Sequence, residues 1–166
     1  MITLFCDLDN TLIYSHKKSL NVPKRVAEML HNKEQSYITR KTFDFLSSCR
    51  EVSIVAVTAR TMAQYDRVYK LLNCLHSEYA LILNGAVLLK NGLQDKSWLA
   101  NSIREVRNSE PEMNTAKKLL EYYGGKPVRY SDRFLTYIDA ADPPKLLEHL
   151  ECCIDSNLIN TFCDSR

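Results

Sequence analysis

Residues 4–12 of the chain, LFCDLDNTL, place two acids directly after an apolar run. Such a run predicts a short buried strand, and Asp7 and Asp9, two residues apart, then point to the same side where the strand ends. Ligands of open α/β sheets bind beyond the carboxyl ends of the strands. Paired carboxylates there suit Mg²⁺, and an aspartate can accept a phosphoryl group covalently. The alternative is that the two acids only form a turn.

A second strand end carries a different set of polar groups. Residues 52–57, VSIVAV, predict a strand buried on both faces, and Thr58 and Arg60 follow it. Thr61 and Gln64 then form a capping-box pattern, which predicts the start of a helix. A hydroxyl, a guanidinium and a helix N-terminus within four residues are suited to holding a phosphate. The alternative is that Thr58 starts a turn and Arg60 is a surface charge.

These two strand ends resemble the first and second motifs of the haloacid-dehalogenase-like (HAD) superfamily, and in particular phosphatases with a large α/β cap that are similar to sucrose-phosphate phosphatases. The resemblance implies that Asp7 is the nucleophile, forming an aspartyl phosphate, and that Asp9 is the general acid and base. It implies Mg²⁺ at Asp7 and Asp9, with the Asp9 backbone carbonyl as a ligand. It also implies phosphate binding at Thr58, Asn10 and Arg60. The implied substrate is a small phosphorylated metabolite, such as a sugar phosphate.

Two further patterns fit the same resemblance. Residues 79–83 predict a strand that ends at Asn84 and Gly85. In the resembled family this position precedes the hairpin that leads to the cap, which implies that Asn84 and Gly85 lie near the substrate. A turn alone would also explain an Asn-Gly pair. Residues 25–30 and 36–38 predict a β-hairpin, which in that family is a flap over the active site.

The element order predicts an α/β protein with a partial doubly wound, mainly parallel (Rossmann-like) sheet and a small α/β cap that contains antiparallel strands. We expect residues 1–92 to form the N-terminal part of the core and residues 93–166 to form the cap. Helices are predicted at 39–50, 61–72, 97–108, 109–123 and 142–153, further strands at 128–130, 134–138 and 158–163, and a loop with His16, Lys17 and Lys18 at 13–20.

Two later motifs of the family have no counterpart in the sequence: a lysine that leads a helix, and a Gly-Asp stretch with distal metal ligands. The resemblance is therefore specific only over about residues 1–90, and we expect a shortened protein with at most weak turnover. An alternative function is a non-catalytic phosphate- or metal-binding remnant, or a fragment that works with another chain. Phosphotransfer to an acceptor would use the same site. A sheet edge left exposed would favour a homo-oligomer.

Composition bears on the partners and the cellular compartment to expect. The 166 residues carry a formal charge of +2, which gives no reason to expect a nucleic-acid or membrane partner. The sequence contains neither a signal-peptide pattern nor an apolar run of membrane-spanning length. Six cysteines lack metal-site or disulfide-framework spacing, which favours the cytoplasm. Periodicity predicts that Cys6, Cys49 and Cys153 are buried thiols.

Overall fold

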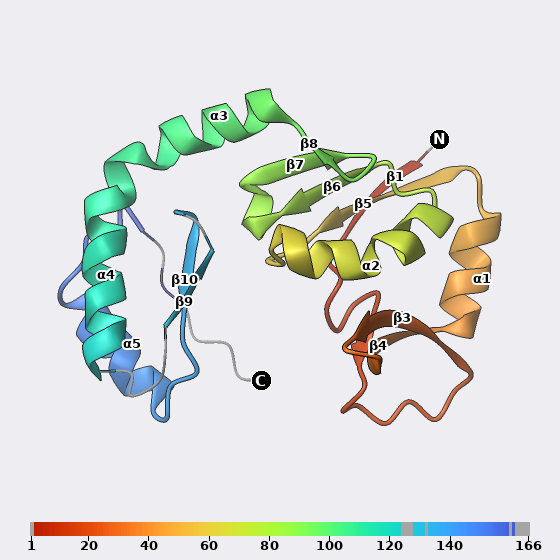
Figure 1. Cartoon of the computed structure of the whole chain (residues 1–166), viewed down its shortest axis with the longest axis horizontal. Helices are drawn as coiled ribbons and strands as arrows, with labels where there is room; N and C mark the ends of the chain where they lie inside the picture. Colours follow the sequence, from red (N-terminus) through yellow and green to blue (C-terminus); the bar gives the residue numbers. More distant parts are fainter. Residues whose placement is uncertain (1, 124–127, 132, 160, 162–166) are drawn as a thin grey trace. The chain divides into compact units, whose positions relative to one another are not determined.

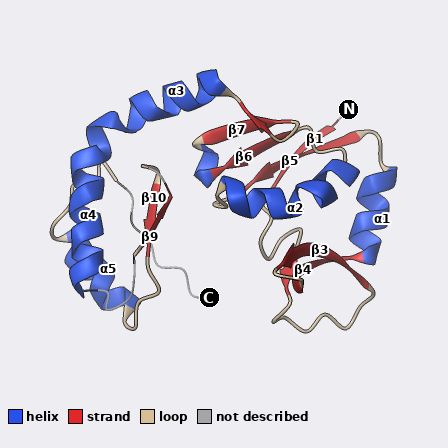
Figure 2. Ribbon diagram, in the orientation of Figure 1, coloured by secondary structure: helices blue, strands red, loops and turns tan. Residues whose placement is uncertain are grey.

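The chain forms two compact units, Met1–Leu99 and Ala100–Arg166 (Figure 1). The structure is a computed structural model, and it describes residues 2–123, 128–131, 133–159 and 161. Both units combine helices with strands (Figure 2). The sequence predicted the boundary between the units near residue 92. In the structure the boundary follows Leu99, within the helix Lys96–Glu105. Within the described ranges, no helix has the length and apolar character needed to cross a membrane.

The first unit is built on a mixed five-stranded sheet with the order β1-β5-β6-β7-β8. β1, β5 and β6 are mutually parallel, whereas β7 and β8 are added antiparallel. This confirms the α/β class; the doubly wound arrangement and the cap stay predictions. The strands are β1 (Ile2–Cys6), β5 (Val52–Val57), β6 (Tyr79–Ile82), β7 (Val87–Lys90) and β8 (Leu93–Gln94).

β1 is an exposed edge strand, so the prediction of a buried strand was wrong. Ile2 and Phe5 are each 65% exposed, and Leu4 is also exposed. β5 lies between β1 and β6, and this position buries Ile54 and Ala56. Periodicity could not separate the two strands because both are apolar runs. Neighbouring strands decide which run is covered.

A second, three-stranded antiparallel sheet has the order β2-β4-β3. It consists of β2 (Tyr14–Ser15), β3 (Lys24–Leu30) and β4 (Lys33–Thr39). The β3–β4 hairpin confirms the prediction. β2 lies inside the predicted loop 13–20, because Tyr14 and Ser15 pair with Tyr37 and Ser36. The register of β3 against β4 shifts on both sides of Glu28.

Two helices of the first unit begin within one residue of the predicted positions. α1 (Arg40–Ser48) begins after Thr39, whose side chain accepts a hydrogen bond from the Thr42 N–H. α2 (Met62–Cys74) begins with the predicted box, in which Thr61 and Gln64 bond reciprocally. α2 contacts β3 and buries Tyr65, Val68, Leu71 and Leu72. The apolar spacing of residues 62–72 also predicts Met62 on the buried stripe of this helix, but Met62, in the first turn, is exposed.

The second unit combines helices with a short hairpin, and α4 contacts both α5 and the hairpin strand β10. α3 (Lys96–Glu105) begins in the first unit and continues through a 3₁₀ turn, Val106–Ser109, into α4 (Glu110–Tyr123). β9 (Arg129–Ser131) and β10 (Leu135–Tyr137) pair antiparallel, and α5 (Pro143–Glu151) follows. The hydrophobic core of the second unit contains Ala116, Leu120, Leu146, Leu150 and Ile159.

Several predictions for the second unit need correction. The capping-box pattern of Ser109 and Glu112 predicts that Ser109 caps the helix at 109–123. Ser109 instead lies within the 3₁₀ turn, because the backbone between α3 and α4 stays helical. Cys153 is exposed in the turn after α5, where the helical period no longer applies. Leu158 lies in a turn, not in a strand. Asp142 before two prolines predicts a cap for the last helix, and this is confirmed, since the Asp142 side chain accepts from the Lys145 N–H. Predictions for 124–127, 132, 160 and 162–166 lie outside the described residues.

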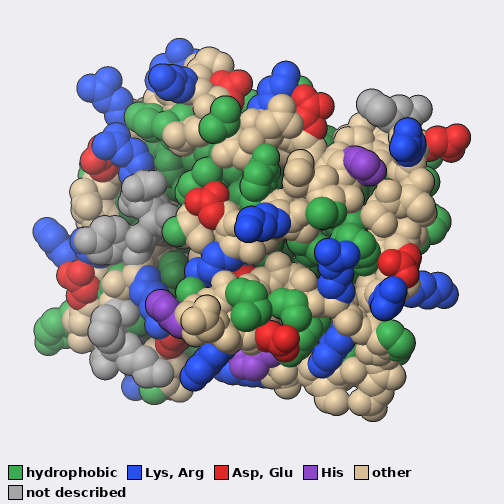
Figure 3. Space-filling view, turned by 45° about the vertical axis from the view of Figure 1, so that its right-hand side comes forward, with side chains coloured by type: hydrophobic (Ala, Val, Ile, Leu, Met, Phe, Trp, Pro, Cys, Tyr) green, Lys and Arg blue, Asp and Glu red, His purple; other side chains and the backbone are tan. Residues whose placement is uncertain are grey.

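Charge on the surface is mixed. The sequence has 22 basic and 20 acidic residues. On the face shown in Figure 3, Lys and Arg side chains are interspersed with acidic and apolar ones. Cys6 and Cys49 are half-buried free thiols, so their predicted burial is partial, and Cys74 and Cys152 are exposed.

Candidate functional site

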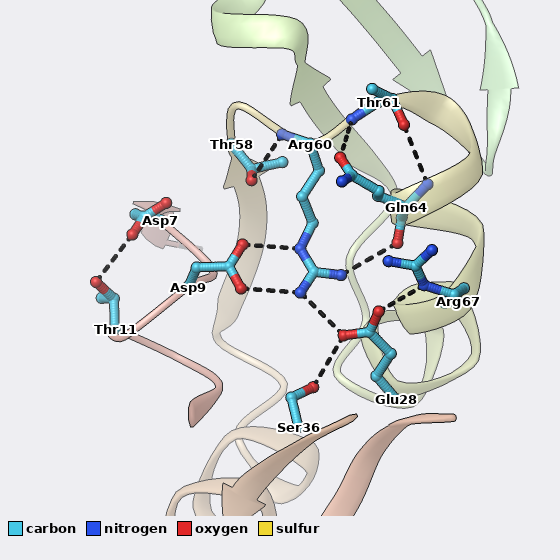
Figure 4. A network of polar contacts seen from close by, with 10 residues as sticks. All are labelled: Asp7, Asp9, Thr11, Glu28, Ser36, Thr58, Arg60, Thr61, Gln64 and Arg67. Carbon is cyan, nitrogen blue, oxygen red and sulfur yellow. Dashed lines mark hydrogen bonds and ion pairs between the residues drawn. The ribbon is translucent and has the colours of Figure 1, made fainter. Parts of the chain in front are cut away.

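The candidate site lies where two parallel strands end. Cys6 of β1 pairs with Ala56 of β5. Asp7 follows one residue beyond this pair and Thr58 two residues beyond it. Parallel strands end at the same edge of a sheet, so the predicted groups gather there, together with Asp9 (Figure 4).

The loop after β1 is fixed by apolar anchors between the acids. Leu8, Leu12 and Ile13 are buried, and the N–H groups of Leu12 and Ile13 both donate to the Leu8 carbonyl. Asn10 adopts the left-handed region with φ 64°, which asparagine tolerates better than most residues. Its N–H donates to the Ile13 carbonyl at 2.8 Å. Burial of Leu8 leaves Asp7 and Asp9, on either side of it, exposed.

Asp7 has a single described side-chain partner. The Thr11 hydroxyl donates to Asp7 Oδ2 at 3.1 Å (Figure 4). This bond orients the carboxylate while the residue stays exposed. An oriented, solvent-accessible carboxylate is what a nucleophile or a metal ligand at this position requires.

Asp9 is bound by Arg60 in a bidentate ion pair. Arg60 Nε donates to Asp9 Oδ2 and Arg60 Nη2 donates to Asp9 Oδ1, both at 2.8 Å. Arg60 Nη1 donates to the Gln64 carbonyl at 3.1 Å. The side chain of Arg60 is only 10% exposed, against 52% for Asp9. Arg60 is therefore occupied by protein acceptors, and its predicted phosphate binding requires the pair with Asp9 to open.

Glu28 of β3 completes this network from the hairpin. Glu28 Oε2 accepts from Arg60 Nη2 at 3.0 Å and from the Ser36 hydroxyl at 3.1 Å, and Arg67 Nε donates to Oε1. Burial by itself raises the pKa of Glu28, but the hydrogen bonds and charges of Arg60 and Arg67 outweigh it, so the net pKa is lowered. Burial opposes the charge of Arg60 in the same way, and Asp9 and Glu28 outweigh it, so its pKa is raised.

Sequence reasoning missed Glu28, Ser36 and Arg67. Regular alternation along β3 would place Glu28 on the face opposite Ala27, yet both residues are buried. The register shifts around Glu28 explain this, because a bulge re-aims the side chain of the bulged strand. The signal that the sequence offered for this network was Glu28 itself, an acid among the apolar residues of a predicted hairpin strand.

Thr58 is buried, with 4% of the residue exposed. Its hydroxyl accepts from the Arg60 N–H at 3.2 Å, and its N–H donates to the Leu81 carbonyl. A hydroxyl that accepts one bond still has a proton to donate. Thr58 can therefore act as a donor to a phosphate only after local opening exposes it.

The turn after β6 is bonded to the same strand end. The Asn84 N–H donates to the Thr58 carbonyl at 3.0 Å, and the Leu83 N–H donates to the Arg60 carbonyl at 3.0 Å. Asn84 is exposed with φ 56°, and the Gly85 carbonyl accepts from the Trp98 indole N–H at 2.9 Å. The predicted substrate-proximal pair thus lies beside Thr58.

The N-terminus of α2 offers fewer free N–H groups for a phosphate than the sequence indicated. The capping box uses the N–H groups of Thr61 and Gln64. Those two donors are satisfied within the protein and are not free for a phosphate.

The basic residues of the predicted loop 13–20 lie at the surface. Lys17 and Lys18 are exposed, as is His16, whose Nδ1 lies 3.1 Å from the Gln35 carbonyl.

The residues fit Mg²⁺ through one carboxylate. Mg²⁺ in proteins is bound by one or two carboxylates and keeps several waters. Asp7 offers such an exposed oxygen, whereas the side chain of Asp9 is held by Arg60. In the part of the chain that the structure describes, no group of three His, Cys, Asp or Glu residues could hold a metal ion.

The fold and the site define an α/β protein with an exposed acid and a partly buried ion-pair network at the carboxyl ends of parallel strands. No family model matches the chain, and no curated protein matches it. The arrangement of these residues therefore carries the functional argument.

Proposed function

We propose that the first unit is a HAD-like, Mg²⁺-dependent phosphomonoester hydrolase that acts through an aspartyl phosphate at Asp7. The observation that carries the proposal is the placement of an exposed, hydroxyl-oriented Asp7 beyond β1, next to the strand end that bears Thr58. Ligands of α/β sheets bind at this edge. The substrate class, a small phosphorylated metabolite such as a sugar phosphate, rests on the resemblance alone.

The chemistry assigned to the chain's own residues has two steps. Asp9 first takes up a proton from solvent as one of its bonds from Arg60 is released. An Asp7 oxygen then attacks phosphorus, the bond from phosphorus to the ester oxygen breaks, and the leaving oxygen takes that proton from Asp9. Asp9 then removes a proton from a water molecule, which attacks the phosphorus of the aspartyl phosphate and releases Asp7 and inorganic phosphate. Mg²⁺, held by the Asp7 carboxylate and the Asp9 carbonyl, would neutralise negative charge on the phosphate. Asn84, Gly85 and Asn10 would line the substrate's approach.

The ion pair between Arg60 and Asp9 affects both proton transfer and charge at the proposed site. Both Asp9 oxygens accept from Arg60, so proton transfer at Asp9 requires one of these bonds to exchange. Arg60 brings a positive charge beside Asp9, but Asp9 and Glu28 already balance it, so it replaces the helix-leading lysine of the family's third motif only when the pair with Asp9 opens. We therefore expect weak turnover.

The test is hydrolysis of an aryl phosphate by the wild-type chain, with Mg²⁺ and with a chelator. Asp7→Asn should reduce turnover to the uncatalysed background, as should removal of Mg²⁺. The matched control is Asp44→Asn, which changes an exposed acid on α1 that forms an ion pair with Arg40 and lies outside the network of Asp9, Arg60 and Glu28. It should keep wild-type turnover. Equal rates in wild type and Asp7→Asn would overturn the proposal.

A second candidate is a non-catalytic phosphate- or metal-binding fragment that works with another chain. The exposed apolar edge strand β1 favours it, since exposed sheet edges are sites of pairing. Binding of inorganic phosphate that depends on Thr58, without Asp7-dependent hydrolysis, would support this candidate over the enzyme.

A further inference from the structure

Glu28 occupies an unusual position in the hairpin. It is a carboxylate with 4% of its side chain exposed, and it is held between two arginines from a different part of the chain. Burial of such a charge without partners is strongly unfavourable, so the hairpin can dock here only with the two arginines in place. The backbone irregularity around Glu28 turns the side chain toward Arg60.

Arg60 connects Glu28 to Asp9 through one nitrogen. Nη2 donates both to Asp9 Oδ1 and to Glu28 Oε2 (Figure 4). A guanidinium is a rigid planar fork, so anchors on Nη1 and Nη2 fix the direction in which Nε and Nη2 face Asp9. The anchors are the Gln64 carbonyl and the buried Glu28 carboxylate.

In the part of the chain that the structure describes, the Asp9 carboxylate is held by Arg60. Its side chain is half-exposed, so surrounding packing does not fix it, and the two 2.8 Å bonds from Arg60 hold it. The order of Asp9 therefore comes from Arg60, and the order of Arg60 comes in part from Glu28. Positioning of a proton-transfer group within a few tenths of an ångström is what general acid and base catalysis needs.

We propose that Glu28 is a positioning residue that fixes the orientation of the Asp9 carboxylate through Arg60. Its effect on turnover rests on the proposed phosphatase function, whereas its effect on Asp9 and Arg60 does not. The competing role is purely structural: Glu28 would only fasten the hairpin to α2 through Arg67. The two roles differ in what happens to Arg60 when each bond of Glu28 is removed.

The direct test follows the Arg60 Nε–H by ¹H–¹⁵N NMR, assigned by its loss in Arg60→Lys. In the wild type this proton, bonded to Asp9, should exchange slowly with solvent. Glu28→Gln should accelerate its exchange about tenfold or more, as expected for loss of a charge-assisted bond. Glu34→Gln is the matched control: it lies on the same hairpin and contacts Tyr37, outside the network. It should leave the exchange rate unchanged.

Arg67→Gln separates the two roles. It removes the other arginine from Glu28 and keeps the bond to Arg60, so positioning predicts a change in Arg60 exchange of less than about threefold. An equal acceleration in Arg67→Gln and Glu28→Gln, or none in Glu28→Gln, would overturn the proposal. If Glu28→Gln does not stay folded, Glu28→Asp takes its place, because it retracts the carboxylate from Arg60 but keeps the charge.

The kinetic test uses aryl phosphate hydrolysis by the same variants. Glu28→Gln should lower kcat about 10- to 100-fold and change KM by less than about threefold, because it displaces a proton-transfer group without touching substrate. Unchanged kcat in a chain whose turnover depends on Asp7 would overturn the positioning role alone. Turnover that does not depend on Asp7 would overturn the phosphatase proposal, and the NMR result would still decide whether Glu28 orders Arg60 and Asp9.

Discussion

Arg60 and Asp9, 51 residues apart in the sequence, form a bidentate ion pair with both N···O distances at 2.8 Å. The pair joins the loop after β1 to the turn before α2. The position of Asp9, one of the two predicted site acids, is therefore set by Arg60, which follows the second strand end. The predictions below concern the stability, pH dependence, ligand binding and association state of the protein.

Arg60→Ala should destabilise the protein far more than Asp9→Asn. Removal of Arg60 leaves Glu28 buried with one arginine fewer, and breaking a buried pair costs about 3 kcal/mol. Asp9 is half-exposed, so its loss should cost less than about 1 kcal/mol. Urea unfolding at pH 7 measures both. Equal losses for the two variants would show that Glu28 does not depend on Arg60.

Stability should fall with acid in a way that depends on Glu28. Its folded pKa is lowered below the ordinary 4.5, so its contribution is present above pH 4.5 and is lost as the pH falls through the folded pKa. The difference in unfolding free energy between wild type and Glu28→Gln should thus be constant from pH 7 to 5 and shrink below about pH 4. Urea unfolding at several pH values measures it. A difference that grows on acidification would contradict the lowered pKa.

Thr58 should contribute to both structure and phosphate binding. Thr58→Val keeps the shape but removes the hydroxyl that accepts from the Arg60 N–H, which should cost about 1–2 kcal/mol. Thr58→Ser keeps the hydroxyl and should retain most of the stability. Phosphate affinity, measured by calorimetry, should fall in Thr58→Val and persist in Thr58→Ser. Equal affinity in the two variants would remove Thr58 from the phosphate site.

The exposed strand β1 should promote association between copies. Residues 2–6 contain neither a charge nor a proline, the features that usually protect an edge strand. Phe5→Lys places a charge on this strand at a residue that is already 65% exposed, so folding should be unaffected. Sedimentation velocity across a concentration series should show association of the wild type and a monomer for Phe5→Lys. The matched control is Phe45→Lys on α1, also exposed, which should associate like the wild type.

The capping box should give a local stability effect that is independent of the site. Thr61→Ala removes the side-chain acceptor for the Gln64 N–H and should cost about 1 kcal/mol. Thr115→Ala on α4 removes a hydroxyl that bonds within its own helix and should cost little. Thermal unfolding compares the two. A larger cost at Thr115 would contradict the cap as the source of the effect.

The sequence by itself determined the features that depend on neighbouring residues. The strands that end at Cys6 and Val57, the reciprocal cap of α2 and the β3–β4 hairpin all follow from short-range apolar pattern and turn chemistry. Parallel pairing then required Asp7 and Thr58 to share one edge of the sheet. These features were predictable because a strand or a cap is specified within about ten residues.

Only the tertiary structure decided which of these residues contact each other. Arg60 meets Asp9 across 51 residues and Glu28 across 32, and no periodicity encodes such distances. The bulge that turns Glu28 inward breaks the alternation on which sequence reasoning depends. The exposure of β1 was equally hidden, because burial of an apolar strand is set by the neighbours that pair with it and cover it, and those neighbours lie far away in the chain.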